Sequence, residues 1–239
     1  MSAPSPPHRG DGAEPCAETV VMIPTLVVSC MAVLVMSVIV SSLHHRPEEI
    51  AGRHAKAYPR HPIRQFPDAQ AGRIVGIALR REPLLRSPLT ARDCIAYVVR
   101  VYERIEAKNE WKLILDVAEA TTFALRDETG LAEIRARDGR MALTVDHFSQ
   151  SGTLSRAPRQ HEVFLQSHEL TSLDTTLKYE EAILTEGERV SVYGFGQHEA
   201  GSESESGKAI GYREQPQRLV MAPSAEKKLF ISNMPSTFE

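Results

Sequence analysis

Apolar and polar residues alternate along the segment CIAYVVRVYERI, residues 94–105. A period of two is the pattern of a strand that buries one face, so Arg100 and Arg104 are expected on the exposed face. The segment WKLILDV, residues 111–117, repeats the alternation and predicts a second strand in which Trp111 faces the core. The apolar face of the first strand comprises Ile95, Tyr97, Val99, Val101 and Ile105.

A hairpin is predicted at residues 121–137, TTFALRDETGLAEIRAR. Phe123 leads into the tetrapeptide at residues 127–130, where Gly130 is expected to take the positive φ that such a loop needs. Shorter strands are predicted for five further segments. They are MALTVDHF (141–148), HEVFLQ (161–166), ERVSVYGFG (188–196), RLVMA (218–222) and KLFISN (228–233).

One short helix is predicted at residues 172–184, SLDTTLKYEEAIL. Thr171 and Asp174 have the spacing of a capping box at its start, and Gly187 lies just past its end. The predicted fold class is therefore mainly β (α+β), with one short helix in a β-rich domain at residues 72–239. The order of strands and helix is typical of an OB-like barrel.

A long apolar run precedes this domain. Residues 19–43 contain no charged side chain, and a helix of that length exceeds the ~30 Å hydrocarbon core of a bilayer. The run predicts a single N-terminal transmembrane helix that contacts the lipid bilayer. A cleaved signal peptide is the alternative, but the segment SSLHHRPEE that follows is a poor cleavage site.

Two polar segments flank the run. Residues 1–18 are rich in Pro, Gly and Ser and predict a disordered tail. Residues 44–71 predict a basic juxtamembrane linker, whose bases either contact anionic lipids or only set the topology of the span. The positive-inside rule places the C-terminal domain in the cytoplasm. The linker bases are Arg46, Arg53, Lys56, Arg60 and Arg64.

Composition excludes several classes of function. The net charge is −3 and aromatic residues make up 6%, which argues against a nucleic-acid partner. The three cysteines, Cys16, Cys30 and Cys94, lie in different segments and predict no disulfide. We find no spacing that indicates a metal site, a cofactor site or a catalytic residue.

Cys94 follows the segment SPLTARD, in which Pro88 predicts a bend that leads into the strand. A reactive thiol requires a positive neighbour, and Arg92 lies two residues away. The flanking Ile95 and Ala96 favour the other interpretation, a buried and inert cysteine. Arg92 and Asp93 are then expected to be solvated at the edge of the domain.

Several of these segments together resemble the GIDE domain, also called the beside-a-membrane domain. They are LLRSPLTARDCIAYVVRVYER (84–104), TTFALRDETGLAEIRA (121–136) and LKYEEAILTEGERVSVYGFG (177–196), followed by RLVMA and LFISN. The resemblance covers roughly residues 74–235. The matching positions are Ser87, Pro88, Leu89, Arg92, Cys94, Tyr97, Trp111, Phe123, Asp127, Gly130, Tyr179, Glu180, Gly187, Glu188 and Gly194.

This resemblance implies a β-rich domain beside a membrane, of a kind found in bacterial membrane proteins and in a mitochondrial ubiquitin ligase. In the ligase a RING finger supplies the activity, and the cysteines of this chain cannot provide its zinc ligands. Two functions stay open. One is a membrane-anchored binding or scaffolding module with an unknown protein partner. The other is a ubiquitin-ligase-type family member whose activity comes from a partner or is lost.

Overall fold

The computed structural model describes residues 47–171, 173–200, 217–224 and 226–239. All of them belong to one compact unit, Arg46–Glu239, and they are mainly β. The predicted tail, the apolar run at 19–43 and Arg46 lie outside the described residues. No helix within the described ranges is long and apolar enough to cross a membrane.

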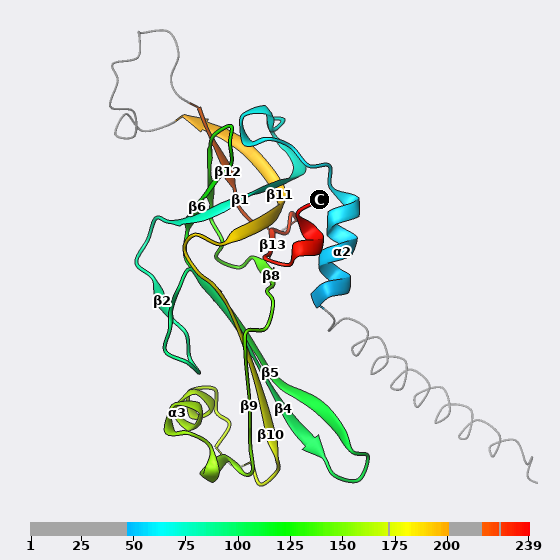
Figure 1. The fold of residues 1–239 in the computed structure, drawn as a ribbon, viewed down its shortest axis with the longest axis vertical. Coiled ribbons are helices and arrows are strands. Elements are labelled where there is room, and N and C mark those ends of the chain that lie inside the picture. Colours follow the sequence, from blue (N-terminus) through cyan, green and yellow to red (C-terminus); the bar gives the residue numbers. More distant parts are fainter. Residues whose placement is uncertain (1–46, 172, 201–216, 225) are drawn as a thin grey trace, which may run out of the picture. The chain divides into compact units, whose positions relative to one another are not determined.

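Five strands form a closed barrel (Figure 1). Its strand order is β1-β6-β7-β12-β11, and β11 pairs in turn with β1. The pair β7–β12 is parallel, and the other neighbours are antiparallel. The strands are β1 (Gln70–Arg80), β6 (Phe123–Arg126), β7 (Leu131–Ile134), β11 (Arg189–Ala200) and β12 (Gln217–Met221).

The barrel interior is filled by alternate residues of these strands, among them Ile74, Phe123 and Leu125, which are fully buried. Gly76 of β1 lies close to the backbone of β6. A Cβ atom at this position would lie 2.4 Å from the carbonyl oxygen of Arg126. Only glycine therefore fits at this contact without a shift of the backbone.

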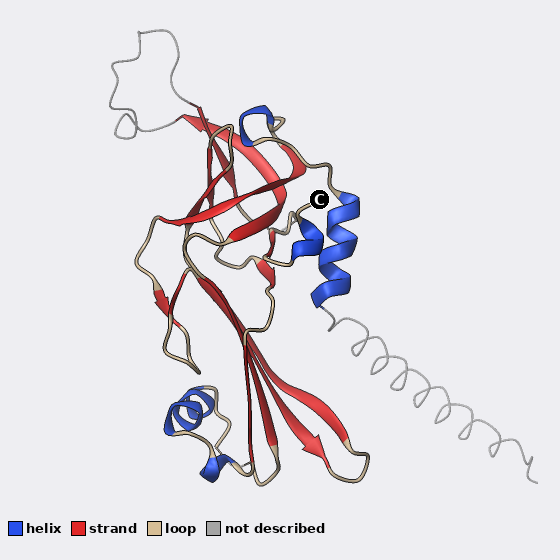
Figure 2. Ribbon diagram, viewed as in Figure 1, coloured by secondary structure: helices blue, strands red, loops and turns tan. Residues whose placement is uncertain are grey.

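A second, antiparallel sheet has the order β5-β4-β10-β9 (Figure 2). The first half of β4 buries both of its faces. Ala96 and Val98 pack into the barrel core. Tyr97 and Val99 pack into a second core, which is formed by residues of β4, β10 and α3 (Arg159–Ser167). The strands are β4 (Ala96–Ile105), β5 (Glu110–Ala120), β9 (His147–Ser151) and β10 (Leu177–Leu184).

The prediction that Trp111 faces the core is wrong. The β4–β5 register shifts between Val101 and Tyr102, which pair with Leu115 and Leu113, so Ile114 is an extra residue on β5. A bulge of one residue inverts the alternation beyond it. Trp111 therefore lies on the outer face of the second sheet, where 37% of its surface is exposed.

Two segments adopt the opposite structure to the predicted one. The segment HEVFLQ lies in α3 (Arg159–Ser167), which buries His161, Phe164 and Leu165 at helical spacing. The segment LKYEEAIL forms β10, where it pairs with β4 and β9, and Thr171 and Asp174 lie in a loop before it. The sheet partners on both sides override the helix-favouring composition of this segment.

The predicted hairpin at residues 121–137 is confirmed as β6 and β7. Gly130 does not take a positive φ, contrary to the prediction. The carboxylate of Asp127 organises the loop instead, because it accepts hydrogen bonds from the backbone N–H groups of Thr129 and Gly130. This is an Asx-type turn, which needs no left-handed residue at its end.

The segment assigned to a linker contributes to the domain. Ala51 of α2 (Pro47–Ala57) is fully buried against the outer side of the barrel, and Ile63 and Phe66 are buried in the barrel core. Only residues 44–46 separate the apolar run from α2. The bases Arg53, Lys56, Arg60 and Arg64 are exposed.

The remaining elements are short. The predicted strands at residues 188–196, 218–222 and 228–233 are confirmed by β11, β12 and β13, and residues 141–148 contribute to β8 and β9. The short elements are η1 (Ile63–Gln65), β2 (Leu85–Arg86), β3 (Asp93–Cys94), β8 (Arg140–Ala142), η2 (Leu154–Arg156), β13 (Phe230–Ser232) and η4 (Pro235–Thr237).

Candidate binding site

Residues 87–92, the SPLTAR segment, form a closed turn between β2 and β3. The backbone N–H of Ser87 donates to the carbonyl of Arg92 at 2.9 Å, and that of Ala91 donates to the carbonyl of Ser87 at 3.0 Å. Ala91 takes a φ of 55°, in the left-handed region. The side chain of Ser87 accepts a further hydrogen bond from the N–H of Arg92 at 3.1 Å. The bend predicted at Pro88 is therefore present.

A buried carboxylate holds this turn in place. Glu181 lies on β10 and is fully buried. It accepts hydrogen bonds from the backbone N–H of Leu89 at 2.7 Å, from the hydroxyl of Ser87 at 3.1 Å and from the hydroxyl of Thr90. A buried charge is tolerated only when such partners replace water. Glu181 therefore couples the turn to the second sheet.

Arg92 completes the network from the surface side. Its guanidinium forms two hydrogen bonds with Asp146, of 3.0 and 2.8 Å, and lies 3.6 Å from a carboxylate oxygen of Glu181. The hydrogen bond with Asp146 is the largest of the effects that raise the pKa of Arg92. Arg92 is partly solvated as expected, since its side chain is 40% exposed. It is not free in solvent, however, because Asp146 holds its guanidinium. Asp93 is exposed as expected.

The predicted burial of Cys94 is confirmed. Its side chain is fully buried in the second core, and its Sγ lies 3.7 Å from the carbonyl of Leu85. Burial, followed by the charge of Glu181, raises the pKa of the Cys94 thiol to about 12. The charge of Arg92 lowers this pKa, but by less than burial and Glu181 raise it. The arrangement gives a protonated thiol, which is a poor nucleophile.

His161 of α3 packs against β10, the strand that carries Glu181. It is buried, and its ring centroid lies 4.6 Å from that of Tyr179. Burial is the main cause that lowers the pKa of His161, and the charge of His147 adds to it. Its Nδ1 atom has no hydrogen-bond partner among the described residues. The neutral imidazole therefore serves as a packing surface between α3 and β10.

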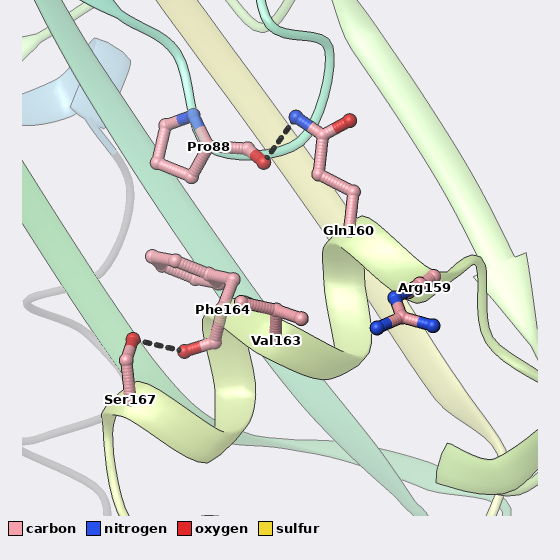
Figure 3. Close-up of a pocket in the computed structure, with 6 residues that line it drawn as sticks. All are labelled: Pro88, Arg159, Gln160, Val163, Phe164 and Ser167. Atoms are coloured by element: carbon pink, nitrogen blue, oxygen red, sulfur yellow. Dashed lines mark hydrogen bonds between the residues drawn. The ribbon is translucent and has the colours of Figure 1, made fainter.

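An apolar groove lies between the turn and α3 (Figure 3). Its volume is about 600 Å³. The side-chain amide of Gln160 donates to the carbonyl of Pro88 at 2.8 Å and ties the helix to the turn. Figure 3 shows Pro88 above the ring of Phe164, with Val163 between that ring and Arg159. The groove is lined by Pro88, Arg159, Gln160, Val163, Phe164 and Ser167.

The groove combines apolar walls with one free charge. Val163 is 55% exposed, on the opposite side of α3 from the buried Leu165. Ser167 is satisfied by its own helix, since its hydroxyl donates to the carbonyl of Phe164. The guanidinium of Arg159 forms no hydrogen bond or ion pair with any described residue. The site can therefore bury an apolar side chain beside an anionic group.

The structure gathers about half of the positions singled out by the sequence. Seven of them surround the turn and the second core, namely Ser87, Pro88, Leu89, Arg92, Cys94, Tyr97 and Tyr179. Eight lie elsewhere. These are Phe123, Asp127 and Gly130 in the β6–β7 hairpin, Gly187 and Glu188 in the β10–β11 turn, Gly194 on β11, and Trp111 and Glu180 on the outer face of the second sheet.

Sequence reasoning missed Glu181, His161 and Asp146. A signal for Glu181 was present, because it shares the buried phase of Tyr179 and Ile183, where a charge needs an explanation. No group of three or more His, Cys, Asp or Glu side chains in the described part of the chain is placed to bind a metal ion.

Comparisons with protein-family models, with curated proteins and with solved structures return no match for this chain. The resemblance to the GIDE domain therefore rests on the sequence motifs alone.

Proposed function

We propose that this chain is a single-pass membrane protein of the GIDE type whose β-rich domain is a binding or scaffolding module at the cytoplasmic surface of the bilayer. The observation that carries the proposal is the groove between the SPLTAR turn and α3. Its floor is rigid, because Glu181 and Gln160 fix the turn from two sides. A preorganised apolar surface binds a partner at a smaller loss of entropy than a mobile one.

The chemistry of the groove favours one kind of partner. The occupant is an extended segment of another protein that presents one apolar side chain next to a carboxylate. Val163, Phe164 and Pro88 contact the apolar side chain, and the unpaired guanidinium of Arg159 pairs with the carboxylate. An apolar contact on one side and an ion pair with Arg159 on the other give the site directionality.

The membrane location rests on the apolar run at residues 19–43. Only three residues separate this run from α2, and Ala51 of α2 is buried in the domain. A chain extends at most ~3.6 Å per residue, so a spanning run holds the domain within roughly 20 Å of the bilayer surface. The partner is then a membrane protein or a protein recruited to the membrane.

We also infer that the barrel is OB-like. Its first, second and third strands form a meander, the last strand pairs in parallel with the third, and the fourth closes the barrel against the first. OB-folds bind nucleic acids or sugars in many proteins. The net charge of −3 and the scarcity of aromatic residues favour a protein partner for this one.

A photo-crosslinking residue in place of Val163 tests the proposal in intact membranes. We expect one discrete crosslinked product that is lost when Arg159→Glu is added. The matched control is a crosslinker at Leu131, which is 52% exposed but lies on the barrel. Equal crosslinking from Leu131, or a Val163 product insensitive to Arg159→Glu, would refute the groove as the binding site.

A further inference from the structure

A second cavity, of about 720 Å³, lies on the outer face of the barrel. Arg126 of β6 and Arg189 of β11 are both register partners of Ile77 on β1, one on each side. Directly paired residues point to the same face, and neighbouring strands lie about 4.8 Å apart. The two arginines are therefore about 10 Å apart at their Cα atoms and project outward together.

A third guanidinium joins them from the segment after α2. The Nη1 of Arg60 donates to the carbonyl of Phe238 at 3.0 Å. The guanidinium of Arg189 lies over the ring of the same Phe238, 5.0 Å from its centroid. Phe238 thus anchors two of the three arginines that line the cavity. Three positively charged side chains therefore line this cavity.

Of the two acidic residues that line the cavity, Glu128 forms no ion pair with any described arginine. Asp127 lines the cavity, but its carboxylate accepts hydrogen bonds from the N–H of Ile63 at 2.8 Å and from Thr129 and Gly130. No ion pair joins Arg126 or Arg189 to any carboxylate of the described residues. The cavity is therefore polar, open and equipped with two guanidinium groups that have no acidic partner.

We propose that this cavity binds the phosphodiester of an anionic phospholipid headgroup. Guanidinium groups match phosphate oxygens with paired, charge-assisted hydrogen bonds. A lipid is favoured over a soluble phosphate because only residues 44–46, α2 and two further residues separate the apolar run from Arg60, and Phe238 follows η4, which packs against α2. The choice of a lipid as the source of the phosphate rests on the proposed function, since it requires that the apolar run before α2 enters a bilayer.

The test uses the full chain purified in a non-ionic detergent. Binding is measured by calorimetry with three probes, namely dioctanoyl phosphatidylglycerol, dioctanoyl phosphatidylcholine and inorganic phosphate. We expect phosphatidylglycerol to bind most tightly. The double variant Arg126→Gln/Arg189→Gln should weaken that binding by about tenfold or more. The matched control is Arg86→Gln, an exposed arginine of β2 outside the cavity, which should leave the affinity unchanged.

Three results would overturn the proposal. The first is an unchanged affinity in the double variant. The second is inorganic phosphate binding as tightly as phosphatidylglycerol, which would indicate a soluble ligand. The third is an equal loss in Arg126→Lys/Arg189→Lys, which keeps the charges and should retain part of the affinity. If lipid binding fails while the Val163 crosslink persists, the lipid site is wrong and the proposed function stands.

Discussion

The backbone N–H of Leu89 donates a 2.7 Å hydrogen bond to the carboxylate of Glu181, which lies 92 residues further along the chain. Leu89 sits in the turn between β2 and β3, and Glu181 sits in the middle of β10. The turn therefore takes its shape from a strand of the second sheet. Because Pro88 of the same turn lines the groove, the shape of the groove depends on this buried contact.

Glu181→Ala should lower the free energy of unfolding by about 3–5 kcal/mol, because it leaves the N–H of Leu89 and the hydroxyl of Ser87 without their acceptor. Urea denaturation of the full chain, followed by circular dichroism, measures the change. The matched control is Glu128→Ala, an exposed carboxylate, for which we expect a change within about 0.5 kcal/mol. Similar small effects in both variants would contradict the structural role of Glu181.

Cys94 should react slowly with thiol reagents in the native protein, in a background with Cys16→Ser and Cys30→Ser. An ordinary thiol is largely ionised above about pH 8.5. Burial raises the pKa of Cys94 to about 12, so its thiolate stays scarce at pH 8 and remains a minor form at pH 10. Labelling rates at these two pH values, with and without denaturant, check this expectation. Fast native labelling at pH 8 would mean that Arg92 activates the thiol.

Trp111→Ala should lower the free energy of unfolding by only about 1 kcal/mol, because the ring is on the outer face of the second sheet. Its contact with the ammonium of Lys178, 5.8 Å from the ring centroid, is a weak one at an exposed site. Phe123→Ala, which empties a fully buried position, should cost about 3–5 kcal/mol. Equal losses in the two variants would mean that Trp111 is part of a core.

Gly187→Ala should destabilise the domain by about 1–2 kcal/mol, because Gly187 has a φ of 90° in the β10–β11 turn. Gly52→Ala is the matched control. Neither glycine has an atom within 4 Å of an added Cβ, so the two substitutions differ only in backbone conformation. Since Gly52 lies in α2, its replacement should stabilise the protein by up to about 1 kcal/mol. Thermal unfolding of both variants provides the comparison.

The full chain should stay with the membrane fraction after alkaline carbonate and after high salt, because the apolar run at residues 19–43 is long enough to be buried in the bilayer. Immunoblots of the pellet and the supernatant measure the distribution. A variant that lacks residues 19–43 should be released. Release of the intact chain by salt alone would show that it is adsorbed through its bases.

Local pattern was sufficient for the strands whose alternation is regular. The strands at residues 188–196, 218–222 and 228–233 and the β6–β7 hairpin follow from the sequence, since each has a clear period of two or a turn signal. The segment HEVFLQ was ambiguous. Six residues are too few to separate a period of two from one of 3.6, although Pro158 stands at the start of α3.

Tertiary structure decided the rest. Strong helix formers make up much of β10, yet this strand is held between β4 and β9, whose hydrogen bonds outweigh local propensity. One extra residue at Ile114 turned Trp111 outward, and no local pattern marks a bulge. The sequence by itself determined an apolar run, a β-rich domain and a buried Cys94. The groove and the arginine cavity arise from residues far apart in the chain, which only long-range pairing brings together.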